Sequence, residues 1–169
     1  MGKRVRVGMI ATILVLVGFG VAAAADRFED EFNWEKIAIG LQQQTAAGGY
    51  QLVGTADLKA WIDAKKDLLI VDTMPYEDSY KKQHVPGAVQ MEFPIPEMTS
   101  LDDKTKAALE KLLGPDKNRL IVFYCGFTKC TRSHNAAMWA VKLGYKNIYR
   151  YPAGIKGWDE AGYPVEKGK

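Results

Sequence analysis

The chain has 169 residues, of which 47% are hydrophobic and 25% charged, proportions typical of one globular domain and not of a disordered chain. It carries 23 basic and 20 acidic side chains, which gives a formal charge of +3. Three of the basic residues lie within the first six positions, so the rest of the chain lacks the clustered positive charge that binds nucleic acid. Two cysteines are too few for a disulfide-rich scaffold.

Residues 1–25 have the three parts of a secretory signal peptide. Lys3, Arg4 and Arg6 form a basic start, nineteen uncharged residues follow, and a run of alanines offers a small-residue cleavage site after Ala25. We therefore expect export to the periplasm. An uncleaved membrane anchor is the alternative, because nineteen such residues nearly span a bilayer. In both cases the rest of the chain meets an oxidising compartment.

Residues 26–49 predict a helical extension, because apolar side chains recur at helical spacing before a pair of glycines. Two continuous apolar runs, 68–71 and 120–124, are typical of strands buried on both faces of a sheet. Shorter strands are expected at 50–54, 88–93 and 148–151. Helices are expected at 56–65 with Thr55 as N-cap, at 76–82, from Ser100 or Asp102 to Leu113, at 136–143 and at 154–158.

This alternation of strands and helices predicts an α/β fold, with a central parallel sheet flanked by helices on both faces. Ligands of such sheets bind beyond the carboxyl ends of the strands, where the loop after Tyr124 is expected to lie. The sequence has no glycine-rich phosphate loop with its lysine, so we expect no nucleotide cofactor.

The loop 125–133 contains both cysteines of the chain. Backbone N–H groups of such a loop and the start of the next helix favour negative charge, and Lys129 and Arg132 add positive charge nearby. These features favour the thiolate of Cys125, which is a nucleophile. We therefore predict that Cys125 attacks an anionic substrate that Arg132 helps to bind.

The pair Cys125 and Cys130 also permits a different interpretation. Two cysteines five residues apart in an exported protein can form a structural disulfide. The position of Cys125 favours a functional role, whereas Cys130 is either a second redox thiol or a passive neighbour. His134 is a candidate base or a packing residue. The spacing of these three residues is not a familiar zinc spacing, so we predict no metal site.

Five segments of the chain occur in an order and spacing that point to a known family. They are the strand 69–72 with the turn Pro75-Tyr76-Glu77, the segment His84-Val85-Pro86-Gly87-Ala88, the strand 121–124 before Cys125, Leu143-Gly144-Tyr145, and Gly154–Trp158. Together they resemble a single-domain rhodanese, a sulfurtransferase. The resemblance covers most of 50–167 and implies a rhodanese-like domain at 50–169, with the extension 26–49 outside it.

The resemblance implies that Cys125 takes sulfane sulfur from thiosulfate, polysulfide or a persulfide, and so becomes a persulfide itself. A thiol reductant or a protein acceptor then takes the sulfur. The N–H groups of the loop would hold the substrate and the sulfur-bearing cysteine, and the residues concerned are Gly126, Phe127, Thr128, Lys129 and Thr131. Asp72 and His84 are expected to support the turns beside the loop.

The loop departs from the family pattern in its length. Six residues separate Cys125 from Arg132, where rhodaneses have four and phosphatases of this fold have five. The longer loop also carries Cys130. We therefore predict that Cys130 can attack a persulfide on Cys125, release sulfide and leave a disulfide.

Two other classes of function remain open. A thiol–disulfide redox protein would form a reversible disulfide without a persulfide. A binding module on the same fold, for a sulfur anion or a protein partner, would keep its affinity without Cys125. A phosphatase or arsenate reductase ranks third, because their arginine lies one residue nearer to the cysteine. We expect no nucleic-acid partner, and contact with a membrane only through an uncleaved N-terminus.

Overall fold

The computed structural model describes Gly2 and residues 20–168, so most of the predicted export segment, 1–25, lies outside the described residues. The chain divides into two compact units, residues 1–36 and 37–169, and helix α1 (Gly20–Gly48) contributes to both. Its backbone is helical through the extension predicted at 26–49. Within the part of the chain that the structure describes, no helix is both long and apolar enough to cross a membrane.

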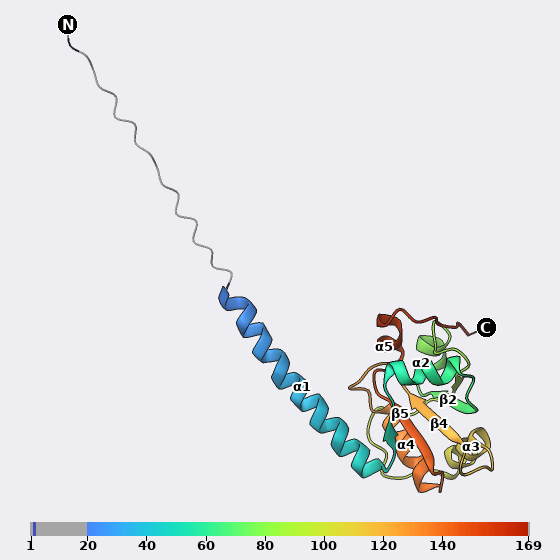
Figure 1. The fold of residues 1–169 in the computed structure, drawn as a ribbon. Coiled ribbons are helices and arrows are strands. Elements are labelled where there is room, and N and C mark those ends of the chain that lie inside the picture. The colour runs from blue at the N-terminus through green and yellow to red at the C-terminus, as the bar shows by residue number, and fades with distance from the viewer. Residues whose placement is uncertain (1, 3–19, 169) are drawn as a thin grey trace. The chain divides into compact units, whose positions relative to one another are not determined.

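Five parallel strands form one sheet in the order β1-β5-β4-β2-β3 (Figure 1). The two apolar runs of the sequence are the strands β2 and β4 near its centre, and four of the five residues in each are buried. The strands are β1 (Gln51–Leu52), β2 (Leu68–Asp72), β3 (Val89–Gln90), β4 (Leu120–Tyr124) and β5 (Asn147–Tyr151). Asp72, Tyr124 and Tyr151 are aligned across the three longest strands, so their carboxyl ends meet at one edge.

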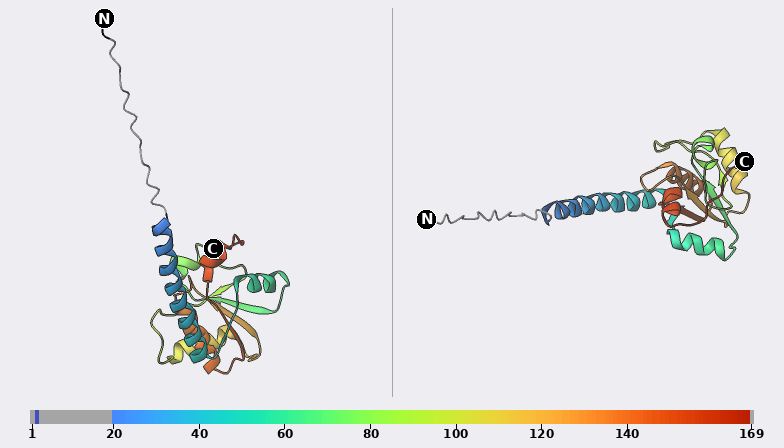
Figure 2. Two further views of the ribbon diagram at one scale, coloured as in Figure 1. Left: turned by 60° about the vertical axis from the view of Figure 1, so that its left-hand side comes forward. Right: turned by 90° about the horizontal axis from the view of Figure 1, so that it is seen from above.

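Helices cover both faces of this sheet, as predicted. The side chains of Ile121 and Phe123 pack under α3 (Asp103–Leu113) and α4 (Arg132–Lys142). Alternate residues of the same strand point to the opposite face, because side chains alternate along a strand. That face is covered by α2 (Thr55–Asp63), α5 (Gly154–Glu160) and the π-helical turn η1 (Tyr76–Tyr80). The view from above in Figure 2 shows α2 and α3 at opposite sides of the domain.

The ends of several elements differ from the sequence expectation. Thr55 is the first residue of α2, whose N-cap is Gly54, and the Thr55 hydroxyl lies 3.0 Å from the Tyr151 hydroxyl. Asp102 does cap α3, since its carboxylate accepts a bond from the Thr105 N–H at 2.9 Å. Helix α4 begins four residues earlier than expected, at Arg132, so the loop after β4 is shorter than the sequence suggested.

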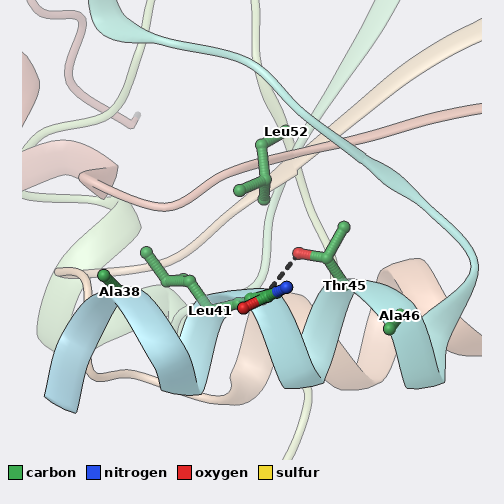
Figure 3. Close-up of a pocket in the computed structure, with 6 residues that line it drawn as sticks. Ala38, Leu41, Thr45, Ala46 and Leu52 are labelled. Atoms are coloured by element: carbon green, nitrogen blue, oxygen red, sulfur yellow. Dashed lines mark hydrogen bonds between the residues drawn. The ribbon is translucent and has the colours of Figure 1, made fainter. Parts of the chain in front are cut away.

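A shallow apolar hollow of about 610 Å³ lies between the last turns of α1 and β1. It is lined by Ala38, Leu41, Gln42, Thr45, Ala46 and Leu52 (Figure 3). The Thr45 hydroxyl donates to the Leu41 carbonyl oxygen at 2.6 Å, so this polar group is satisfied within the helix. The hollow shares no residue with the loop 125–133.

The packing of α3 against the sheet can be tested with two leucines of the same helix. Leu113 is fully buried in the core, whereas Leu112 is only partly buried. Leu113→Ala should lower the free energy of unfolding by about 2–5 kcal/mol, because it removes buried methyl groups and leaves a cavity. Leu112→Ala should cost clearly less in the same urea denaturation experiment. Equal losses would contradict the assigned packing face.

Candidate functional site

The loop between β4 and α4 lies at the carboxyl edge of the sheet and begins at Cys125. The first turn of α5 fixes the first two residues of the loop. The N–H groups of Ile155 and Lys156 donate to the carbonyl oxygens of Cys125 and Gly126, both at 3.0 Å. Gly154 makes this approach possible. It has a φ of +64°, and a Cβ there would lie 2.2 Å from the Cys125 carbonyl oxygen.

The two cysteines are free thiols that are both buried in this loop. The sulfur of Cys125 has no exposed surface and lies 3.3 Å from the Cys130 carbonyl oxygen and 3.2 Å from Ser133 Oγ. Cys130 is 6% exposed. The loop therefore brings together the two residues that the sequence analysis singled out for sulfur chemistry.

The electrostatics of the pair differ from the expectation of a Cys125 thiolate. A hydrogen bond between the two thiols, together with burial, raises the pKa of Cys125 well above its usual value. The same bond lowers the pKa of Cys130 to about 6, and the backbone N–H groups of Arg132 and Gly126 add to this effect. The loop N–H groups thus favour negative charge on Cys130, whereas burial and the neighbouring thiol favour the protonated form of Cys125.

The side chain of Arg132, which we expected to bind substrate, is engaged outside the loop. Its guanidinium donates to the Phe93 carbonyl oxygen and to the Glu92 carboxylate, the latter at 3.2 Å. It therefore ties the start of α4 to the segment after β3. Its positive charge and its backbone N–H still help to lower the pKa of Cys130.

Arg150 of β5 is a residue of the site that the sequence analysis missed. Its guanidinium is fully buried beneath the loop. It donates to Gln44 Oε1 at 2.5 Å, the Cys130 carbonyl oxygen at 2.9 Å, Ser133 Oγ at 3.0 Å, and the Tyr50 hydroxyl and the Thr128 carbonyl oxygen at 3.4 Å each. In the sequence, the only signal for this role was a charged residue within an apolar strand.

Ser133, also fully buried, connects Arg150 to Cys125. An arginine can only donate hydrogen bonds, so the Ser133 hydroxyl is the acceptor in its bond with Arg150 Nε. Its own proton is then free to point at the Cys125 sulfur. This bond acts to lower the pKa of Cys125, against the larger effects of Cys130 and burial.

Asp72, the last residue of β2, and His84 were expected to support the turns beside the loop. The Asp72 carboxylate is fully buried and accepts the Met74 N–H at 2.9 Å, and burial raises its pKa to about 6. His84 Nδ1 lies 2.8 Å from the Tyr80 carbonyl oxygen, and its ring stacks on that of Tyr80. Neither side chain makes a hydrogen bond to the loop cysteines.

The remaining loop residues differ in exposure, and His134 faces away from the chemistry. Phe127 is 50% exposed and Lys129 is exposed, whereas Thr131 is anchored by a bond from its hydroxyl to the Ile95 carbonyl oxygen. His134 Nδ1 lies 2.8 Å from the Tyr50 hydroxyl, and the histidine is 1% exposed. It is therefore a packing residue and not a base for Cys125. Among residues 20–168, no three potential metal ligands cluster together.

Comparison with known proteins identifies the family of this chain. A family model described as the rhodanese-like domain matches residues 55–161, more than half of the chain. The chain therefore belongs to the rhodanese-like domain family. The predicted resemblance is confirmed, and the extension that carries Gln44 precedes the matched region.

Three solved structures share the fold at low sequence identity. A thiosulfate sulfurtransferase from Pseudomonas aeruginosa is 20% identical with a TM-score of 0.58, over 74% of this chain and 22% of that one. A polysulfide-sulfur transferase homodimer from Wolinella succinogenes is 20% identical with a TM-score of 0.55, over 78% and 90%. A protein of unknown function from Rhodopseudomonas palustris, described as a possible tyrosine phosphatase, is 22% identical with a TM-score of 0.53, over 94% and 100%.

The contact between Gly154 and the loop predicts that this position tolerates no side chain. Gly154→Ala should lower the melting temperature strongly and disturb the reactivity of Cys125, because the new methyl group would collide with the Cys125 carbonyl oxygen. Gly162→Ala is the matched control, since Gly162 has a similar φ of +70° but open space around it. Similar effects of both substitutions, measured by thermal denaturation and thiol titration, would contradict the proposed constraint.

The lowered pKa of Cys130 predicts the order in which the two thiols react. Only a thiolate is alkylated, so the rate of labelling Cys130 with iodoacetamide should rise with pH and reach half its maximum near pH 6. Cys125 should be labelled only at higher pH, because its pKa is raised. Peptide mass mapping assigns the label, and Cys130→Ser should remove the low-pH reaction. Labelling of Cys125 first, at neutral pH, would contradict this assignment.

Proposed function

We propose that this protein is an exported, periplasmic sulfurtransferase that carries sulfane sulfur on Cys125 and uses Cys130 to release it. Its rhodanese-like fold, shared with sulfurtransferases, supports a function of the sulfurtransferase type. The observation that carries the finer proposal is the pair of buried, hydrogen-bonded free thiols in one loop at the carboxyl edge of the sheet. The lowered pKa of Cys130 supports the same proposal, because the thiolate is the form that attacks a persulfide.

Sulfur uptake can proceed without an outside oxidant. With thiosulfate as donor, the Cys125 sulfur attacks the outer sulfur atom, the S–S bond of thiosulfate breaks, and sulfite leaves with the bonding electrons. The Cys130 thiolate is placed to accept the Cys125 proton as the new bond forms. This proton ends on the outer sulfur, so a thiol and thiosulfate give a persulfide and sulfite.

Sulfur release uses the electrons of the second thiol. The Cys130 thiolate attacks the inner sulfur of the persulfide, forms a disulfide with Cys125 and expels hydrosulfide. Two electrons from the thiol pair thereby reduce the sulfane sulfur. A dithiol reductant, or a protein that presents one, must then reduce the disulfide. A thiophilic acceptor can instead take the sulfur directly from Cys125.

The candidate donors follow from chemistry and from the structural relatives. The relatives from Pseudomonas aeruginosa and Wolinella succinogenes are described as acting on thiosulfate and polysulfide, respectively. Both donors are small anions with a sulfur–sulfur bond. A small donor suits a nucleophile that is fully covered in the resting structure.

The second candidate function is thiol–disulfide exchange without sulfur transfer. The lowered pKa of Cys130 favours it, because redox-active pairs hold one cysteine as a thiolate. This alternative predicts a disulfide under mild oxidation, without any persulfide or sulfide.

Intact mass spectrometry of the reduced protein after exposure to thiosulfate, and then to polysulfide, tests the proposal. Cys130→Ser should accumulate the mass of one added sulfur atom, because the resolving thiol is missing. The native protein should release sulfide and lose two hydrogens. Cys125→Ser should do neither.

Three outcomes would contradict the proposal. Sulfur addition to Cys125→Ser would make Cys130 the acceptor. Loss of two hydrogens without sulfide release would favour thiol–disulfide exchange. If neither donor changes the mass of the native protein or of Cys130→Ser, the sulfurtransferase mechanism is wrong, and retained anion binding by Cys125→Ser would then support a binding module.

A further inference from the structure

Arg150 is a fully buried positive charge. All five of its N–H groups have an acceptor, and every acceptor is an uncharged oxygen. Among residues 30–168, whose side chains the structure describes, no carboxylate lies within ion-pair distance of this guanidinium. Buried charges are usually paired, because a charge removed from water loses its hydration. A function that needs an unpaired charge at this place would explain the exception.

The unpaired charge is connected to the Cys125 sulfur by one hydroxyl group. Arg150 Nε lies 3.0 Å from Ser133 Oγ, which lies 3.2 Å from the sulfur. Because Ser133 accepts from the arginine, its own proton is free to point toward the sulfur, where it can stabilise negative charge. The other end of the guanidinium holds the carbonyl oxygens of Thr128 and Cys130, which fixes the second half of the loop.

Gln44 connects this arrangement to helix α1. Its amide oxygen accepts a bond from Arg150 Nη1 at 2.5 Å, and residues 37–48 belong to the same compact unit as the loop. A glutamine satisfies the donor and leaves the positive charge intact, whereas a carboxylate of the same shape would neutralise it. The last turns of the extension, which precede the family match, therefore complete the surroundings of Arg150.

We propose that Arg150 is a positioning residue that stabilises negative charge on the Cys125 sulfur through Ser133, and that Gln44 keeps this charge available by binding the guanidinium without neutralising it. The inference rests on the proposed function, because the sulfur is negatively charged during uptake and release of the sulfane sulfur. It assigns to the extension a direct influence on the reaction.

Gln44→Glu tests this proposal with little change in shape. The new carboxylate should pair with Arg150 and raise the pH midpoint for alkylation of Cys125 by about one unit, because the positive charge that favours its thiolate is neutralised. Persulfide formation from thiosulfate at pH 7 should slow about tenfold, because a pKa higher by one unit lowers the thiolate fraction tenfold. The melting temperature should not fall, because the guanidinium keeps all its partners.

Other charged groups near the two thiols are unchanged in this variant. They are Asp72 from β2 and Arg132 from α4, and the exposed Lys129 of the same loop is unchanged too. Arg150 itself is faced by Tyr50 and His134, with Glu97 4.0 Å beyond the histidine. A shift of the midpoint can therefore be attributed to the neutralised guanidinium.

Three further variants control for structural effects. Gln43→Glu places the same charge on the exposed side of α1 and should change neither measurement. Gln44→Met removes the acceptor but keeps the charge of Arg150, so it should lower the melting temperature with little change of the pH midpoint. In a Ser133→Ala background, Gln44→Glu should have a much smaller effect, because the connecting hydroxyl is absent.

The proposal is wrong if Gln44→Glu melts like the native protein and keeps its pH midpoint. It is also wrong if the shift is as large in the Ser133→Ala background. These outcomes are separate from a failure of the proposed function, because alkylation needs no sulfur donor. A protein that forms no persulfide, but whose midpoint shifts in Gln44→Glu, would refute sulfur transfer and still support the action of Arg150 on the thiols.

Discussion

The burial of one guanidinium organises the site of this protein. Arg150 is held in place by β5, and its five hydrogen bonds reach α1, the residue before β1, the loop and the start of α4. A buried donor without a partner is costly, so each of these five acceptors has to stay where it is. The conformation of the loop is therefore coupled to segments more than 100 residues away in the sequence.

The sheet supplies the frame that makes this possible. Parallel pairing aligns the ends of β2, β4 and β5 at one edge, so turns from three different parts of the chain meet there. Asp72 stabilises the first of these turns, the cysteine loop is the second, and the third leads into α5. Gly154 lies close to the Cys125 carbonyl oxygen, and this contact fixes the distance between the cysteine loop and the turn that leads into α5.

The sequence was sufficient to predict the strands, the two layers of helices and the position of the cysteine loop, because these depend on local patterns such as the apolar runs of β2 and β4. It was not sufficient to predict the direction in which the pKa of each cysteine is shifted, since that depends on the directions of a few N–H groups in the folded loop. The role of Arg150 depends on contacts between residues far apart in the chain, and no local pattern records them. Arg132 was assigned by its place in the loop, but the early start of α4 turns its side chain toward Phe93.

The complete burial of Cys125 also has a kinetic consequence. In the proposed sulfur transfer, a sulfur atom without exposed surface can be reached only when the loop between β4 and α4 opens, so the opening rate would set an upper limit on turnover at saturating donor. The same cover would protect a persulfide on Cys125 from oxidants between its formation and its release. A slowly opening loop would thus lower the rate of sulfur transfer and lengthen the lifetime of the persulfide.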